Sequence, residues 1–308
     1  SDLLDGINHL NELDWGMNLG NPTTEDVDAL GVLSPDAGET NAAPVISISG
    51  VVSVVEAGVF VGGNEAKAGV PTASGQINAH DPDGDALNFA FVAPDGSLVT
   101  SITTEYGTIT INPDGTYTYV LDNDKANGLA EGDVVNENFT VQVSDGRGGT
   151  AQATVTVNVT GSNDVPTLAL GKDHLTVADD GANAVEGAIT DGGTARGDDP
   201  DAGHDLRYSF GTDDDGNPVT SITDEYGTLT IDPDTGEYTY TLDKNSEAVQ
   251  KLTGNGDDVT QRVTVVVTDE HGAHAEVPLD ITIKGANDTP VITAVTEHVK
   301  DMGVLGED

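Results

Sequence analysis

Residues 100–114 read TSITTEYGTITINPD and residues 220–234 read TSITDEYGTLTIDPD, so 12 of 15 positions are identical at an offset of 120 residues. The similarity continues on both sides of this stretch. DGTYTYVLD at 114–122 matches TGEYTYTLD at 235–243, and HDPDGDALNFAF at 80–91 matches DDPDAGHDLRYSF at 198–210. A module of about 120 residues therefore occurs twice, and repetition on this scale decides the architecture before any local pattern does.

Within each copy, apolar and polar residues alternate with a period of two. Runs such as TYTYVL at 116–121, ATVTVNV at 153–159 and YTYTL at 238–242 are separated by turn sequences such as NPDG and SDGRGG. Strict alternation buries one face of each strand and leaves the other in water. The pattern predicts an all-β chain of antiparallel sandwiches in tandem. We expect short helices only within residues 1–40 and at 246–252.

Three proline-containing segments divide the chain: NAAP at 41–44, NDVP at 163–166 and NDTP at 287–290. Each lies beside the first strand of a module. We therefore expect an N-terminal extension and linker at 1–40, a first repeat at 41–162 and a second repeat at 163–286. Residues 287–308 are expected to form a junction and the first strand of a truncated third repeat.

The composition excludes several classes of function. Fifty-four acidic residues against 11 basic ones give a formal net charge of −43, the wrong sign for binding nucleic acid or an anionic membrane surface. The sequence contains no run of about 18 apolar residues, so it predicts no membrane-spanning helix. Cysteine is absent, so neither disulfides nor thiolate metal sites can stabilise the chain. Salt or bound divalent cations must neutralise part of the repulsion between the carboxylates.

Four motifs occur twice in the same order: the NDxP junction, the DPDGD-type loop, the EYGTxTIxPDGxYTY core and the SDGxGG-type hairpin. They resemble the VCBS and cadherin-like repeats of large bacterial RTX-type surface adhesins, over roughly residues 41–290. The resemblance implies Ig-like or cadherin-like sandwiches joined end to end, with calcium at or near the junctions. The NAAP junction departs from the pattern because it lacks the acidic residue, and no glycine-rich RTX nonapeptide is present.

Calcium requires six to eight oxygen ligands on a loop that can surround the ion. In an Ig-like topology the DPDGD-type loop and the preceding junction lie at the same end of a repeat, which predicts three sites. For the junction between repeats 1 and 2 we expect Asn163, Asp164, Asp199, Asp201, Glu105 and Glu56. For the N-terminal end of repeat 1 we expect Asp81, Asp83, Asp85 and Asn41. For the C-terminal end of repeat 2 we expect Asn287, Asp288 and Glu225. Asp145, in the late hairpin of repeat 1, is a further possible donor.

Other candidate residues have simpler interpretations. The tyrosine pairs at 117/119 and 238/240 each share one strand face, which predicts buried rings rather than a ligand platform. The HGAH sequence at 271–274 predicts an exposed hairpin rather than a zinc site. TDDDGNP at 212–218 predicts a solvated hairpin tip. No nucleophile elbow, phosphate loop or HExxH motif occurs, so we do not expect an enzyme.

These observations predict a calcium-rigidified stalk fragment of a secreted bacterial surface adhesin that supports adhesion and biofilm formation. Its partners would be the neighbouring repeats, and the fragment would be monomeric. Two alternatives remain: a module that binds a glycan or a partner protein through the divergent loops at 125–138 and 244–259, or an accessory stalk of a secreted enzyme. Self-association through the strand at 291–295 is a further possibility.

Overall fold

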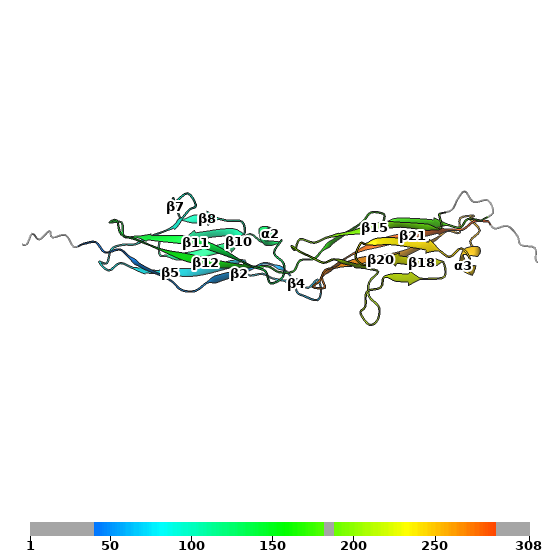
Figure 1. The fold of residues 1–308 in the computed structure, drawn as a ribbon, viewed down its shortest axis with the longest axis horizontal. Helices are drawn as coiled ribbons and strands as arrows, with labels where there is room; N and C mark the ends of the chain where they lie inside the picture. Colours follow the sequence, from blue (N-terminus) through cyan, green and yellow to red (C-terminus); the bar gives the residue numbers. More distant parts are fainter. Residues whose placement is uncertain (1–39, 182–187, 288–308) are drawn as a thin grey trace, which may run out of the picture.

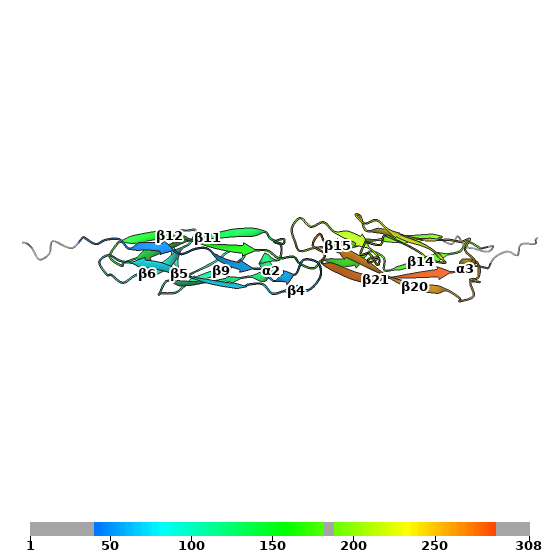
Figure 2. The same ribbon diagram turned by 90° about the horizontal axis from the view of Figure 1, so that it is seen from below.

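The computed structural model describes residues 40–181 and 188–287. The helix expected near the N-terminus and the strand expected at 291–295 lie outside these ranges. The described residues form two β-sandwiches that follow one another along the long axis of the molecule (Figures 1 and 2). Among them, no helix is long and apolar enough to span a membrane.

The first sandwich consists of two five-stranded sheets. One sheet has the order β1-β5-β10-β9-β8, with β1 (Val45–Ile48), β5 (Thr72–His80), β10 (Thr116–Leu121), β9 (Gly107–Ile111) and β8 (Ser101–Thr103). The other has the order β2-β12-β11-β6-β7, with β2 (Val52–Val55), β12 (Thr150–Thr160), β11 (Val134–Ser144), β6 (Asn88–Val92) and β7 (Leu98–Val99). A two-stranded hairpin, β3 (Gly58–Val59) and β4 (Ala66–Lys67), lies outside both sheets.

The second sandwich repeats this topology. Its sheets have the orders β13-β15-β19-β18-β17 and β14-β21-β20-β16. The strands are β13 (Thr167–Leu170), β14 (His174–Ala178), β15 (Thr190–Asp198), β16 (Arg207–Ser209), β17 (Ser221–Thr223), β18 (Gly227–Ile231), β19 (Glu237–Leu242), β20 (Val259–Thr268) and β21 (His274–Lys284). In both sandwiches the first strand is divided between the sheets, and its second half runs parallel to the last strand: β2 pairs with β12, and β14 pairs with β21.

The alternating runs place their apolar side chains between the two sheets, as the period of two predicts. Tyr117, Tyr119, Tyr238 and Tyr240 are all buried. The Tyr119 hydroxyl donates a hydrogen bond to Glu137 Oε2 over 2.6 Å, so its polar end is satisfied at the rim of the core. These contacts confirm that the tyrosine pairs are part of the core.

Two single-turn helices follow β10 and β19. α2 (Asn123–Ala126) was not expected from the sequence, whereas α3 (Glu247–Gln250) lies within the expected range 246–252. Ser246 caps α3 because its side chain accepts a hydrogen bond from the Val249 N–H over 3.1 Å. Figure 1 shows α2 near the middle of the molecule and α3 at its far end, so each helix lies at the same end of its own sandwich.

Replacing a core leucine in the repeated motif will destabilise the fold, whereas replacing an exposed one will not. Leu229 is 1% exposed and Leu98 is 53% exposed. We expect Leu229→Ala to lower the free energy of unfolding by about 2–5 kcal/mol, because it leaves a cavity. Leu98→Ala should change it by less than about 0.5 kcal/mol. Chemical denaturation followed by circular dichroism compares the two, and equal losses would contradict the assigned core.

Candidate metal centre at the seam between the repeats

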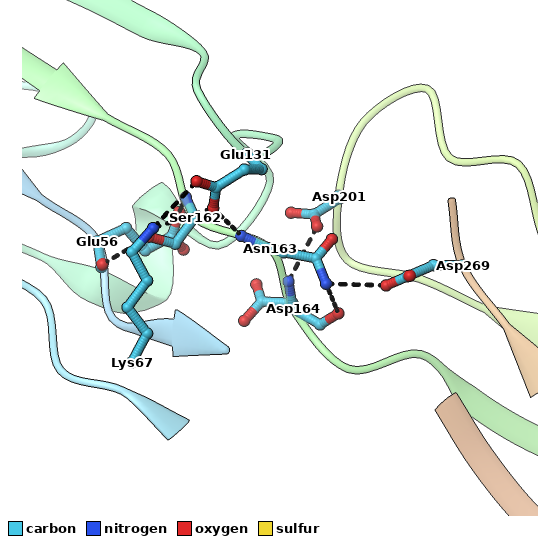
Figure 3. Close-up of polar contacts among 8 residues, drawn as sticks. All are labelled: Glu56, Lys67, Glu131, Ser162, Asn163, Asp164, Asp201 and Asp269. Carbon is cyan, nitrogen blue, oxygen red and sulfur yellow. Dashed lines mark hydrogen bonds and ion pairs between the residues drawn. The ribbon is translucent and has the colours of Figure 1, made fainter. Parts of the chain in front are cut away.

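The two sandwiches meet at a cluster of five acidic side chains and one asparagine, which we call the seam: Glu56, Asn163, Asp164, Asp199, Asp201 and Asp269. Figure 3 shows all of them except Asp199. Three elements of the fold bring these residues together. Glu56 follows β2, Asn163 and Asp164 follow β12, and the other three aspartates lie in loops of the second sandwich. Glu56, Asn163, Asp199, Asp201 and Asp269 are all buried, with at most 7% of each residue exposed.

Backbone N–H groups orient one oxygen of each of three seam carboxylates. The Ser162 N–H donates to Glu56 Oε2 over 3.2 Å, and the Asp201 N–H donates to Asp199 Oδ1 over 2.9 Å. The Asp164 N–H donates to Asp201 Oδ2 over 3.0 Å, which ties the linker to the second sandwich. Each of these carboxylates is therefore held at a fixed angle by the main chain.

The second oxygen of each of the same carboxylates is buried and has no hydrogen-bond partner. These atoms are Glu56 Oε1, Asp199 Oδ2 and Asp201 Oδ1. Asp164 Oδ2 is likewise buried without a hydrogen-bond partner. A buried carboxylate oxygen without a partner costs a large share of its hydration free energy. Divalent cations bound between the loops could satisfy these atoms once the loops closed around them, because calcium takes its ligands from such oxygens. The donor set therefore fits calcium.

Burial and mutual repulsion disturb the ionisation of the seam. Burial raises the pKa of Glu56 to about 7, and the charges of Asp164 and Asp201 add to the rise. Burial likewise raises the pKa of Asp164 and of Asp201 to about 6 each, with neighbouring carboxylates contributing. The pKa of Asp199 is raised as well, mainly by burial. The seam is therefore an environment that disfavours negative charge unless a positive charge is supplied.

The N-terminal end of the first repeat has the same framework. The Asn41 amide donates to Asp145 Oδ2 over 2.7 Å, as the Asn163 amide donates to Asp269 Oδ2 over 2.9 Å. The Ala42 N–H donates to Asp83 Oδ2 over 2.7 Å, in the manner of Asp164 and Asp201. This equivalence identifies Asp145 and Asp269 as candidate ligands. The sequence indicates Asp145 as a possible donor, whereas Asp269 was not predicted.

Asp81, Asp83 and Asp85 each offer one carboxylate oxygen that lies within 4.8 Å of the other two. Asp81 Oδ2 and Asp85 Oδ2 are buried without a partner, whereas Asp85 Oδ1 pairs with Arg147 over 3.2 Å. Among the described residues, no other triple of acidic or histidine side chains is so compact. The seam carboxylates do not form such a triple, so they would have to move closer together to share an ion.

The remaining predicted ligands lie in other parts of the chain: Glu105, Glu225, Asn287 and Asp288. Glu105 lies in the turn between β8 and β9, where it lines a groove of about 470 Å³ with the start of α2; it takes no part in the hydrogen bonds of the seam described above. Glu225 lines a corresponding groove of about 370 Å³ beside α3. Asn287 is exposed at the end of the described chain, and Asp288 lies outside it.

Asp179 is the counterpart of Glu56 in the second repeat. The Glu56 N–H donates to the Thr160 carbonyl over 2.9 Å, and the Asp179 N–H donates to the Lys284 carbonyl over 3.0 Å. Asp179 is 4% exposed, and Gln250 approaches it. Sequence reasoning missed it because the segments that follow Glu56 and Asp179 differ in length, which hides the alignment.

The fold and the seam can now be compared with known proteins. Residues 41–161 match the family model of the bacterial cadherin-like domain, which confirms the resemblance seen in the sequence for the first repeat. A curated relative is 35% identical over 162 residues, covering 51% of this chain: the calcium-binding lectin RapA2 of Rhizobium johnstonii. The chain matches 65% of that relative's length.

Solved cadherin structures are also similar. Mouse cadherin-23 EC22–24 is 15% identical with a TM-score of 0.42, covering 80% of this chain and 67% of that one. Protocadherin gamma B2 domains 1–5 are 12% identical with a TM-score of 0.43, covering 82% and 41%. At these scores the similarities add nothing to the fold that the strand pairing already defines.

The raised pKa values predict how stability depends on pH in the presence of a chelator. Between about pH 4.5 and about pH 7 the folded chain retains a proton on Glu56 that the unfolded chain has lost. The free energy of unfolding should therefore fall as the pH rises through this window. Glu56→Gln should flatten the fall, whereas Glu276→Gln, at an exposed position, should not. Thermal melts across the window measure both, and a stability that rises with pH in wild type would contradict the burial of these charges.

Proposed function

We propose that this chain is an extender segment of a bacterial surface adhesin in which calcium joins consecutive repeats. The observation that carries the proposal is the set of four buried carboxylate oxygens at the seam without hydrogen-bond partners. A protein that merely required a flexible linker would gain nothing from burying them. The cadherin-like family match and the calcium-binding relative support the same interpretation.

Calcium would supply positive charge and oxygen coordination at the seam. Glu56 would contribute from the first sandwich, Asp164 from the linker, and Asp199 and Asp201 from the second sandwich. Because these ligands belong to both repeats, binding would favour the aligned arrangement and add to the stability of the folded chain. Asp81, Asp83, Asp85 and Asp145 would form an equivalent site at the N-terminal end of the first repeat, and Asp179 and Asn287 would contribute to one at the C-terminal end of the second.

The proposal extends to the setting of the protein. An extender with a net charge of −43 remains soluble and repels its neighbours, which suits a secreted chain on a bacterial surface. Extracellular calcium at about millimolar concentration would fill weak sites, whereas low cytosolic calcium would leave them empty before export. Adhesion and biofilm formation would then follow from the parent protein's binding domain rather than from these repeats.

The seam can be tested by removing two of its carboxylates. Asp199→Asn with Asp201→Asn should abolish one calcium-binding event and reduce the rise in melting temperature that calcium causes, because the linker loses its counterpart in the second sandwich. Isothermal titration calorimetry and thermal melts with and without calcium provide the measurements. Asp213→Asn with Asp215→Asn, in the exposed hairpin tip, removes the same charge and should change neither. Equal behaviour of the two double variants would refute a calcium site at the seam.

The compact cluster of the first repeat predicts a second, separate binding event. Asp81→Asn with Asp83→Asn should remove one calcium ion from the stoichiometry and leave the seam unaffected, because the two clusters lie at opposite ends of the first sandwich. Calorimetry on this variant and on the combined variant with Asp199→Asn and Asp201→Asn separates the sites. If the losses do not add, the ions share one site and the assignment of two clusters fails.

Glycan binding is the second candidate function, since the curated relative is a lectin. The grooves beside α2 and α3 are the candidate positions, and each combines a glutamate and a lysine: Glu105 with Lys125, and Glu225 with Lys251. A glycan array with wild type and with Glu105→Ala plus Lys125→Ala tests this function. Binding that the variant loses would favour a lectin, and no binding at all would leave the extender proposal alone.

A further inference from the structure

The first repeat contains a longer segment than the second repeat between two equivalent points of the fold. Glu56 corresponds to Asp179, as shown above, and Thr72 corresponds to Thr190, because they pair with the equivalent residues Val120 and Thr241. The first repeat has 15 residues, 57–71, between these points, and the second has ten, 180–189. The longer segment of the first repeat contains the β3–β4 hairpin, residues 58–67, which we call the clasp.

The clasp lies between the two sandwiches rather than on its own (Figures 1 and 2). The Val59 N–H donates to the Asn163 carbonyl over 2.7 Å, which attaches β3 to the linker. Gly58 allows this approach because a side chain there would overlap the Asn163 carbonyl oxygen. The clasp is therefore fixed to the chain that connects the repeats.

The tip of the clasp continues to the second sandwich. The Gly62 N–H donates to the His271 carbonyl over 2.6 Å. The Asn64 side chain makes two hydrogen bonds with the backbone of His274, donating from Nδ2 to the carbonyl over 2.7 Å and accepting from the N–H over 2.9 Å. The tip of the clasp is thus hydrogen-bonded to the turn between β20 and β21. The HGAH turn, expected from the sequence to be a plain exposed hairpin, is instead half-buried by this contact.

The base of the clasp supplies a positive charge beside the seam. Lys67 Nζ lies 3.0 Å from Glu131 Oε2, and the same oxygen accepts a hydrogen bond from the Asn163 N–H over 3.1 Å (Figure 3). Both side chains are about three-quarters buried, at 24% and 27% exposed. Lys67 therefore neutralises Glu131 and holds it against the linker without a bound metal.

A contact on a different element supplements the clasp. The Ala202 N–H, in the loop that carries Asp199 and Asp201, donates to the Gly128 carbonyl after α2 over 3.3 Å. The two sandwiches are thus attached through two separate loops of the second repeat, one on β20–β21 and one on β15–β16. None of these bonds involves a carboxylate oxygen that a metal would use.

We propose that the clasp is a metal-independent lock that keeps the two repeats aligned when no calcium is bound. This inference does not depend on the calcium proposal, since it concerns the metal-free chain. On this proposal the repeats do not swing freely about the linker when calcium is absent. Calcium then adds stability to a joint that is already aligned.

The absence of cysteine makes a direct test simple, because two introduced cysteines can be labelled alone. Ser97→Cys and Asp215→Cys place one exposed label on each sandwich. Pulsed electron paramagnetic resonance in excess chelator then measures the distribution of distances between the repeats. We expect a narrow distribution for the otherwise wild-type chain. Asn64→Ala with Lys67→Ala should broaden it at least twofold, and calcium should narrow it again.

A matched control removes the same two residue types away from the seam. Lys244→Ala with Asn245→Ala breaks the ion pair between Lys244 and Asp180 in an exposed loop, and its distribution should stay narrow. Circular dichroism establishes that each variant is folded, and Lys67→Arg should retain most of the alignment. A broad distribution for the wild-type chain in chelator, or a narrow one for the clasp variant, would overturn the proposal.

The two proposals fail separately. Calorimetry on the Asn64→Ala plus Lys67→Ala variant should still detect calcium at the seam, because no proposed ligand has been changed. Loss of calcium binding in the Asp199→Asn plus Asp201→Asn variant, with a narrow distribution in chelator, would leave both proposals standing. If the distance measurements contradict the clasp proposal, the proposal of a calcium site at the seam is not affected.

Discussion

The seam depends on one electrostatic constraint: several carboxylates are buried together, each with one oxygen fixed by a backbone N–H and the other bare. Glu56, Asp199 and Asp201 share this arrangement, and burial raises the pKa of each. Hydrogen bonds from the main chain set the orientation of each carboxylate. That orientation therefore depends on the positions of the strand ends and loops that supply the N–H groups. Buried charges of one sign are tolerated only if a counter-charge is supplied. The architecture of the junction is in this sense arranged around a positive charge.

Two kinds of positive charge would serve the same junction if calcium binds there as proposed. Lys67 pairs with Glu131 from the clasp, whereas Glu56, Asp164, Asp199 and Asp201 each have a buried oxygen without a hydrogen-bond partner. A covalently attached ammonium is always present, while a bound ion depends on its concentration outside the chain. Combining the two would give a joint with a permanent alignment and an adjustable stiffness. If the chain is an extender as proposed, a junction that never loosens completely would be an advantage.

Duplication explains why the same physical solution occurs at both ends of the first sandwich. Asn41 and Asp145 reproduce the contact between Asn163 and Asp269, and the Ala42 N–H reproduces that of Asp164. A backbone N–H serves as well from alanine as from aspartate, which is why the NAAP segment keeps the framework although it loses a carboxylate. The DPDGD loop adds Asp85, which has an oxygen within 4.8 Å of one oxygen each of Asp81 and Asp83. Asp81 and Asp85 each keep one buried oxygen without a hydrogen-bond partner. The sandwich is thus a module with an acidic loop at its N-terminal end and a receiving edge at its C-terminal end.

The sequence by itself determined the repeat, the β-sandwich class and the core, because alternation with a period of two fixes which side chains face inward. It also indicated Asn163, Asp164, Asp199 and Asp201, since motifs beside a junction proline must lie at one end of a sandwich. Only the tertiary structure revealed Asp269 and Asp179, and separated Glu105 from the seam contacts. These differences arise from pairing between distant strands and loops, which local patterns do not encode. The position of the clasp could not be predicted from the sequence either. The segment of 15 residues in the first repeat, against ten in the second, reveals an insertion. Where its tip lies is decided by hydrogen bonds to residues more than 200 positions away.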